Sequence, residues 1–125
     1  MASQNFSKED RLCSSRRIET LFSEGESLYE FPFKVIWLKD DTLQSTVKVA
    51  ISVPKKKLSK SSQRNHIKRL VREAYRKQNT FLVEKLLQEN KSINLILVYT
   101  LPSILSFTEI EDKISVTLLR LADEV

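Results

Sequence analysis

Three stretches of the chain carry apolar residues at the three- and four-residue spacing of an amphipathic helix. They predict helices over residues 14–24, 63–89 and 108–123. Gly25 directly follows the first stretch, where a glycine commonly ends a helix. At the start of the last stretch, Thr108 and Glu111 have the spacing of a capping box, in which each side chain bonds the backbone N–H of the other residue.

The remaining apolar stretches have the pattern of strands. Residues 46–53 alternate strictly, with Val47, Val49, Ile51 and Val53 on one side and Lys48, Ala50 and Ser52 on the other. Residues 27–39 are rich in aromatic and β-branched side chains, and Pro32 predicts a break or an edge position there. Residues 93–100 form an apolar run that is too short to span a membrane and is typical of a buried strand.

Length and composition fit one domain over residues 1–125, and its predicted helices and strands together indicate the α+β class, with residues 1–12 expected to form a flexible arm. Of the 125 residues, 41% are hydrophobic and 30% are charged, as in ordinary folded proteins. Cys13 is the single cysteine, so no internal disulfide can form and a reducing compartment is expected. The first residues lack the apolar centre of a signal peptide, so we expect a cytoplasmic protein.

Positive charge is concentrated in one segment. Residues 55–77 hold ten Lys or Arg residues and one acid, Glu73, so their net charge of +9 exceeds the +5 of the whole chain. The rest of the chain carries 11 basic and 15 acidic residues and is mildly acidic. The positive charge is therefore local, which indicates a local target.

A helical wheel at about 100° per residue separates this segment into two faces. An arc of about 140° on that wheel is cationic and contains Arg64, Asn65, Lys68, Arg69, Arg72 and Arg76. A neighbouring arc is apolar and contains Ile67, Leu70, Val71, Ala74, Tyr75 and Leu82. Glu73 falls outside the cationic arc, so no acid on that face is expected to neutralise it.

The ordinary explanation of a charge run is a solvated helix face, but such a face normally mixes the two signs. This face is almost purely positive and rich in arginine, whose planar guanidinium fits phosphate oxygens. Ser61 and Ser62 are candidate N-caps, and the helix start beside the lysine loop, residues 55–60, would add backbone N–H groups as anion donors. A membrane-surface helix is less favoured, because the apolar stripe is needed for packing. We therefore expect a nucleic acid as partner, although charge alone does not distinguish DNA from RNA.

The sequence predicts no catalytic or metal-binding residues. Nucleases commonly use clustered carboxylates or a histidine pair, whereas His66 is the single histidine and has no metal-binding spacing to Cys13. Residues 111–113 resemble a fragment of a nuclease metal motif but lie in the first turn of a helix, where acids favour the helix dipole. Asp40 and Asp41 have the pattern of a turn.

The segment RNHIKRLVREAYR, residues 64–76, resembles the signature helix of the bacterial ribonuclease P protein component, which has the pattern R-N-x-x-K-R-x-x-R-E-A. SVPKKK resembles the turn before that helix, and SSRRIETLFSEGES resembles the first helix of the family with the glycine after it. KVIWLKD, VKVAISV and INLILVYTLP fall where the strands of the family lie. The resemblance covers nearly the whole chain.

This resemblance implies an α-β-β-β-α-β-α order, with a central sheet and a left-handed β-α-β crossover, the fold of domain 2 of ribosomal protein S5. The usual hand of such a crossover is right-handed. The resemblance also implies that the partner RNA is the catalyst, which removes the 5′ leader of precursor tRNA with Mg²⁺ held mainly by the RNA. The protein would bind the catalytic RNA and the leader, with one protein per RNA and no role for a membrane.

By position, the resemblance assigns RNA binding to the signature helix and the loop before it. The residues are Lys55, Lys56, Lys57, Lys60, Arg64, Asn65, His66, Lys68, Arg69, Arg72 and Arg76. Phe22 and Trp37 match aromatic positions of the family's central cleft, where a single-stranded leader would stack. Ordinary core packing is the alternative for each of these two aromatics.

The chain departs from the family pattern at several positions. His66 stands where arginine is usual, which predicts a weaker or pH-dependent phosphate contact. Ser59, Ser61 and Ser62 replace a glycine and a small apolar pair in a loop with one extra residue, and Ile18 replaces a frequent aromatic. The chief alternative function is a non-catalytic RNA- or DNA-binding module such as a ribosome-associated protein. A stand-alone metal nuclease ranks third.

Overall fold

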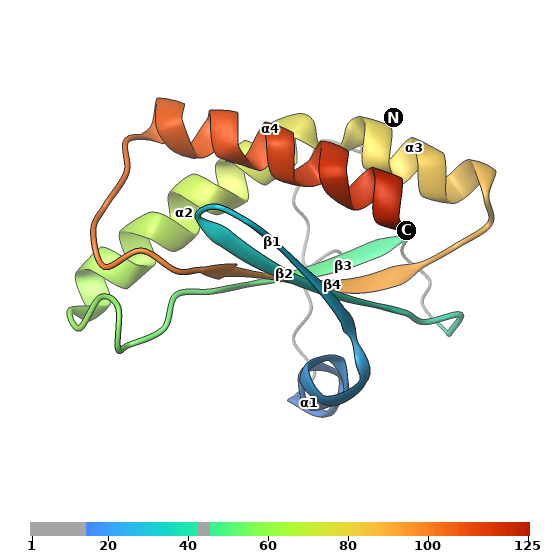
Figure 1. The fold of residues 1–125 in the computed structure, drawn as a ribbon, viewed down its shortest axis with the longest axis horizontal. Helices are drawn as coiled ribbons and strands as arrows, with labels where there is room; N and C mark the ends of the chain where they lie inside the picture. The colour runs from blue at the N-terminus through green and yellow to red at the C-terminus, as the bar shows by residue number, and fades with distance from the viewer. Residues whose placement is uncertain (1–14, 43–45) are drawn as a thin grey trace.

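A four-stranded sheet forms the middle layer of the fold, with α1 on one side and α2, α3 and α4 on the other (Figure 1). The computed structural model describes residues 15–42 and 46–125. The helices are α1 (Ser15–Glu24), α2 (Ser61–Gln78), α3 (Thr80–Gln88) and α4 (Phe107–Glu124). The strands are β1 (Glu26–Glu30), β2 (Phe33–Lys39), β3 (Val47–Ser52) and β4 (Ile93–Tyr99). Cys13 and the predicted arm lie outside the described residues.

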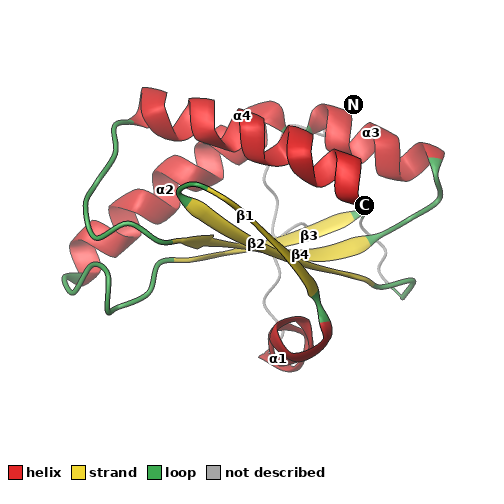
Figure 2. Ribbon diagram, viewed as in Figure 1, coloured by secondary structure: helices red, strands yellow, loops and turns green. Residues whose placement is uncertain are grey.

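The strand order in the sheet is β1-β2-β4-β3, so the last strand in sequence is inserted between two earlier ones. β1 and β2 form an antiparallel hairpin, β2 pairs antiparallel with β4, and β3 pairs parallel with β4. A parallel pair requires a crossover, and α2 and α3 provide it (Figure 2). The α-β-β-β-α-β-α order and the α+β class are confirmed, while the hand of the crossover stays a prediction.

The sheet is apolar on both faces, and each face packs against its own helices. Val35 and Trp37 of β2 belong to the large core under α2, α3 and α4, together with Leu95 and Leu97 of β4. Alternate residues belong to a smaller cluster under α1, whose buried members are Leu21, Ile36 and Ile96. Such two-sided burial is expected of inner strands and explains the continuous apolar runs in the sequence.

The helix predicted over residues 63–89 is in fact two helices. α2 ends at Gln78 and α3 begins at Thr80, with the buried Asn79 between them. The carbonyl of Asn79 still accepts a hydrogen bond from Val83 N–H, so the backbone bends without losing that bond. The apolar periodicity continues into α3, and Leu82 is fully buried there. The break therefore redirects the helix without changing which residues face the core.

The capping box of the last helix lies two residues before the predicted one. Ser106 is the N-cap of α4: its Oγ accepts from Glu109 N–H, and the Glu109 carboxylate accepts from Ser106 N–H. Thr108 is an exposed residue inside the first turn, so the assignment to Thr108 and Glu111 was wrong. The predicted helix end is confirmed at Gly25, which directly follows α1, and the predicted break is confirmed at Pro32, which lies between β1 and β2.

Candidate nucleic-acid interface

The apolar arc of α2 faces the core as the sequence predicts. Ile67, Val71, Ala74 and Tyr75 are buried, so the cationic arc beside them is turned toward the surface. Asn65, His66 and Arg69 are exposed, while Arg64, Lys68, Arg72 and Arg76 are half-buried. The long stem of Lys68 can lie against the helix while its ammonium group reaches solvent, whereas Nε of Arg72 is buried.

The lysine loop before α2 is held by one apolar residue and one arginine. Lys55, Lys56, Lys57 and Lys60 are exposed, whereas Leu58 in the middle of the loop is buried. Arg64 Nη1 donates to the carbonyl oxygens of Leu58 and Ser59, at 2.9 and 2.8 Å. Arg64 thus orders the loop that presents the four lysines, in addition to the phosphate contact predicted for it.

The start of α2 differs from the expected serine cap. The N-cap residue is Lys60, which makes no side-chain capping hydrogen bond, and Ser61 and Ser62 are exposed residues inside the first turn. The prediction of a serine N-cap is therefore wrong. The helix start nevertheless adjoins the lysine loop, and its first turn contains no acid.

One end of the cationic arc is neutralised within the protein. Arg76 donates two hydrogen bonds to the Glu73 carboxylate, at 2.8 and 2.6 Å, across three positions of α2. The Arg76 hydrogen bond lowers the pKa of Glu73, and the same contact raises the pKa of Arg76. The expectation that no acid would pair with this face is wrong at Arg76, because a three-residue spacing also brings helical side chains together.

The opposite side of the sheet carries a second candidate surface, beside α1. Phe22 extends the apolar stripe of α1 but is 55% exposed. The sheet register places Tyr29, Lys34, Val98 and Ser52 side by side in one row across all four strands on the α1 side. Tyr29 is 51% exposed and Lys34 is exposed, so this row offers an aromatic ring and a cation. The strand pairing was needed to find these two residues.

Trp37 does not belong to that surface, and its assignment to the leader cleft was wrong. Its side chain is only 5% exposed and packs in the core under α2, α3 and α4. Residues 36 and 38 of β2 face α1, so alternation along the strand directs Trp37 to the other side. Core packing is the role that the structure gives to this tryptophan.

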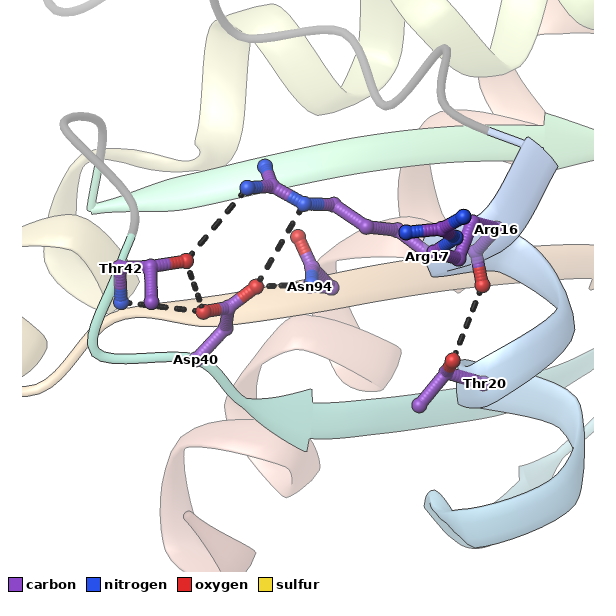
Figure 3. A network of polar contacts seen from close by, with 6 residues as sticks. All are labelled: Arg16, Arg17, Thr20, Asp40, Thr42 and Asn94. Carbon is purple, nitrogen blue, oxygen red and sulfur yellow. Dashed lines mark hydrogen bonds and ion pairs between the residues drawn. The ribbon is translucent and has the colours of Figure 1, made fainter.

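A polar network joins α1 to the ends of β2 and β4 (Figure 3). One Asp40 carboxylate oxygen accepts from Thr42 N–H and the Thr42 hydroxyl, at 3.0 and 2.5 Å. The other oxygen accepts from Asn94 Nδ2 at 3.0 Å and lies 3.7 Å from Arg17 Nε. The Thr42 hydroxyl contributes most to lowering the pKa of Asp40, and the Asn94 and Arg17 contacts act in the same direction. Asp40 therefore stays ionised at neutral pH.

The described residues offer no obvious metal site. Across residues 15–42 and 46–125, no group of three or more His, Cys, Asp or Glu side chains comes together in a way that could hold a metal ion. The Glu111 carboxylate lies 3.9 Å from Lys77 Nζ, and Lys113 lies over the Phe31 ring. Within the same residues, the structure contains no helix with the length and apolar character needed to cross a membrane.

Comparison with known proteins gives one consistent family. The family model for ribonuclease P matches residues 6–121. The ribonuclease P protein component of Porphyromonas gingivalis is 32% identical over 126 residues, covering 99% of this chain and 91% of that protein.

Solved structures show the same fold. The RNase P protein of Staphylococcus aureus superposes with a TM-score of 0.68 at 20% identity, over 90% of this chain and 94% of that one. The RNase P protein of Thermotoga maritima gives a TM-score of 0.66 at 24% identity, over 88% of this chain and 96% of that one. Together with the match of the family model along most of the sequence, these comparisons show that the chain belongs to the ribonuclease P protein family.

Proposed function

We propose that this chain is the protein subunit of a ribonuclease P ribonucleoprotein, in which it binds the catalytic RNA and the 5′ leader of precursor tRNA. The endonucleolytic cut that produces the mature 5′ end takes place in the RNA subunit. The protein raises the affinity for the precursor and assists the use of Mg²⁺.

The observation that carries this proposal is the cationic surface formed by the lysine loop and α2. Four lysines of the loop are exposed, and Lys68, Arg69 and Arg72 continue the surface along the helix. Phosphate groups of a folded RNA are the polyanion that suits such a surface, because each neutralised phosphate releases bound counterions. Arg64 contributes by holding the loop in place.

The α1 side of the sheet is the surface that we assign to the leader. Phe22 and Tyr29 are exposed aromatic side chains on which unpaired bases can stack, and Lys34, the strand neighbour of Tyr29, can contact a phosphate. The sheet separates this surface from most of α2 (Figure 1). One small domain can in this way bind two parts of the RNA at once.

Mg²⁺ belongs, in this proposal, mainly to the RNA. The described residues include no group of three or more His, Cys, Asp or Glu side chains placed to hold it. The family resemblance supports the location of the metal on the RNA, a stoichiometry of one protein per RNA, and action in the cytoplasm, where precursor tRNA is processed.

Reconstitution tests the proposal. The purified chain should cleave no precursor tRNA alone, and it should restore 5′ processing at low Mg²⁺ when a bacterial ribonuclease P RNA is added. Cleavage by the protein alone would instead favour a metal nuclease. Binding to ribosomes or DNA with no effect on the RNA enzyme would favour a different nucleic-acid-binding module.

A further inference from the structure

We infer that Asp40 is a positioning residue for leader binding: it holds the N-terminal end of α1 against the sheet and so fixes the place of Phe22. This inference rests on the proposed function for its consequence in RNA binding. Its structural part concerns only the contacts of α1 with the sheet.

α1 is attached to the sheet by little apolar surface. Its fully buried contact is Leu21, packed on Ile36 and Ile96, and Ile18 adds a partly buried contact. By comparison, the core on the other side of the sheet contains more than twenty buried residues from α2, α3, α4 and the strands. A helix held by so small a cluster needs further attachments to keep one orientation.

The C-terminal end of α1 has such an attachment at Gly25. A Cβ placed there would lie 2.4 Å from the Leu21 carbonyl oxygen, 2.9 Å from Ile36 Cγ2 and 3.0 Å from the Trp37 carbonyl oxygen. The absence of a side chain therefore allows the backbone after α1 to lie directly on β2. Gly25 N–H also donates to the Leu21 carbonyl, at 2.9 Å.

The N-terminal end of α1 is attached through Arg17 to Asp40. The guanidinium lies 3.7 Å from the carboxylate through Nε, and Nη2 donates to the Thr42 hydroxyl at 3.4 Å (Figure 3). Asp40 is held in place by contacts that do not involve Arg17. Its N–H donates to the Ser92 carbonyl, and its carboxylate accepts hydrogen bonds from Thr42 and Asn94. The acceptor is thus rigid, and the arginine from α1 binds to it.

Loss of this ion pair weakens the attachment at the N-terminal end of α1, where the 3.4 Å hydrogen bond from Arg17 to the Thr42 hydroxyl and the partly buried Ile18 remain. The helix can then tilt about its Gly25 end, which moves Phe22 relative to Tyr29 and Lys34 on the sheet. A stacking surface made of separate elements binds well only when their spacing is fixed, since ordering them on binding costs free energy. The affinity for the catalytic RNA, which in the proposed function binds α2, should stay the same.

Asp40→Asn tests this with little other disturbance. The new amide can still accept from Thr42, and the unpartnered Oδ1 of Asn94 can accept from its N–H after a flip of the Asn94 amide. The negative charge is lost, which removes the attraction of Arg17 and also makes the hydrogen bonds from Thr42 neutral and weaker. Asp41→Asn is the matched control, because it removes the same charge one residue away, where the exposed Asp41 lies 3.8 Å from the exposed Lys39.

In the reconstituted holoenzyme, Asp40→Asn should weaken precursor tRNA binding about two- to fivefold, the factor expected for a partly exposed ion pair. Mature tRNA binding and assembly with the RNA should not become weaker, and Asp41→Asn should weaken none of the three properties. By electrostatics alone, removal of an acid would strengthen RNA binding. A weaker affinity of Asp40→Asn for precursor tRNA would therefore indicate a loss of positioning and not an effect of charge. Arg17→Gln should also weaken precursor binding selectively, and adding Asp40→Asn to Arg17→Gln should weaken it no further.

Amide hydrogen exchange in the free protein gives a readout that needs no RNA. Asp40→Asn should speed exchange in α1 selectively, with β4 and α2 unchanged. Stronger precursor binding in Asp40→Asn, equal loss for precursor and mature tRNA, or unchanged exchange in α1 would each overturn the inference. Equal wild-type affinity for the two tRNAs would instead overturn the leader assignment, and the exchange rates would still decide whether Asp40 holds α1.

Discussion

At the scale of single residues, the cations of the basic segment differ in what they contact. Arg64 and Arg76 both lie on the cationic arc, yet Arg64 bonds two loop carbonyls and Arg76 bonds Glu73. Arg69 is exposed. Helical periodicity predicted the arc correctly, but these pairings depend on rotamers and on the path of a loop, which periodicity does not contain.

Arg69→Ala should weaken assembly with the catalytic RNA without affecting folding, because Arg69 is exposed on α2. Loss of one phosphate contact should reduce the slope of log affinity against log salt by about 0.7 to 0.9. Affinity measured between low and moderate salt gives this slope. Lys91→Ala is a charge-matched control at the far end of α3, where Lys91 pairs with Glu89, and its slope should equal that of the wild type. An unchanged slope in Arg69→Ala would remove phosphate binding from this face.

Asp40 also predicts a pH dependence of stability. Its pKa is lowered in the folded protein, chiefly by the Thr42 hydroxyl, so the ionised form is favoured by folding. The resulting stabilisation is fully present above the unfolded pKa of about 4 and is lost as pH falls through the lower folded value. Denaturant titrations should therefore give a constant stability difference between wild type and Asp40→Asn above about pH 5. That difference should shrink in more acidic solution, and a difference independent of pH down to acid would contradict the ionic role of Asp40.

At the scale of elements, the sequence predicted which helices exist and which of their faces are buried better than it predicted where each helix begins and ends. The apolar stripe of residues 63–89 runs through the break at Asn79, because Leu82 and Leu86 keep the same periodicity in α3. Ser106–Glu109 and Thr108–Glu111 both fit a capping box, and only the path of the preceding loop selects the first. Local patterns of this kind allow two answers, and tertiary packing decides between them.

Val71→Asp should unfold the domain. Val71 is completely buried in the core under α2, and an unpaired carboxylate placed there has no partner to offset the loss of hydration. Val116→Asp is the matched control, since Val116 is 49% exposed on α4 and its replacement should change the melting temperature little. Thermal melts followed by circular dichroism compare the two variants. A melting curve like that of the wild type for Val71→Asp would show that α2 is rotated from its position in the structure.

Gly25→Ala should displace α1. The added methyl group would meet two backbone carbonyl oxygens and Ile36, and backbone atoms cannot move aside as a flexible side chain can. Overpacking of this kind costs about 1–3 kcal/mol, which should appear as a lower free energy of unfolding in denaturant. Glu24→Ala, an exposed neighbour, provides the comparison. Equal stability of the two variants would mean that α1 can shift freely on the sheet.

At the scale of the whole molecule, the order of elements followed from the sequence and its family resemblance, but the faces of β2 did not. Val35, Ile36, Trp37 and Leu38 are all apolar because this inner strand is covered on both sides. With no polar residue to mark a solvent face, the pattern could not say which pair lies under α1. Tyr29 and Lys34 were missed for a related reason, since their proximity comes from strand pairing.

The corrected faces change what aromatic substitutions should do to the assembled enzyme. Phe22→Leu keeps much of the apolar volume but removes the flat ring, so precursor tRNA should bind about fivefold more weakly or worse, since stacking is worth about 1–3 kcal/mol per base. Mature tRNA and assembly with the catalytic RNA should be unaffected. Phe31→Leu is the control, because Phe31 is also half exposed but lies beneath Lys113 of α4.

Trp37→Leu should behave differently from both, because it removes volume from the core and lowers the melting temperature. At temperatures where the variant remains folded, its preference for precursor over mature tRNA should equal that of the wild type. Affinities for the two tRNAs, measured in the reconstituted holoenzyme beside thermal melts, separate these outcomes. A selective loss of precursor binding in Trp37→Leu, with none in Phe22→Leu, would contradict binding of the leader on the α1 side of the sheet.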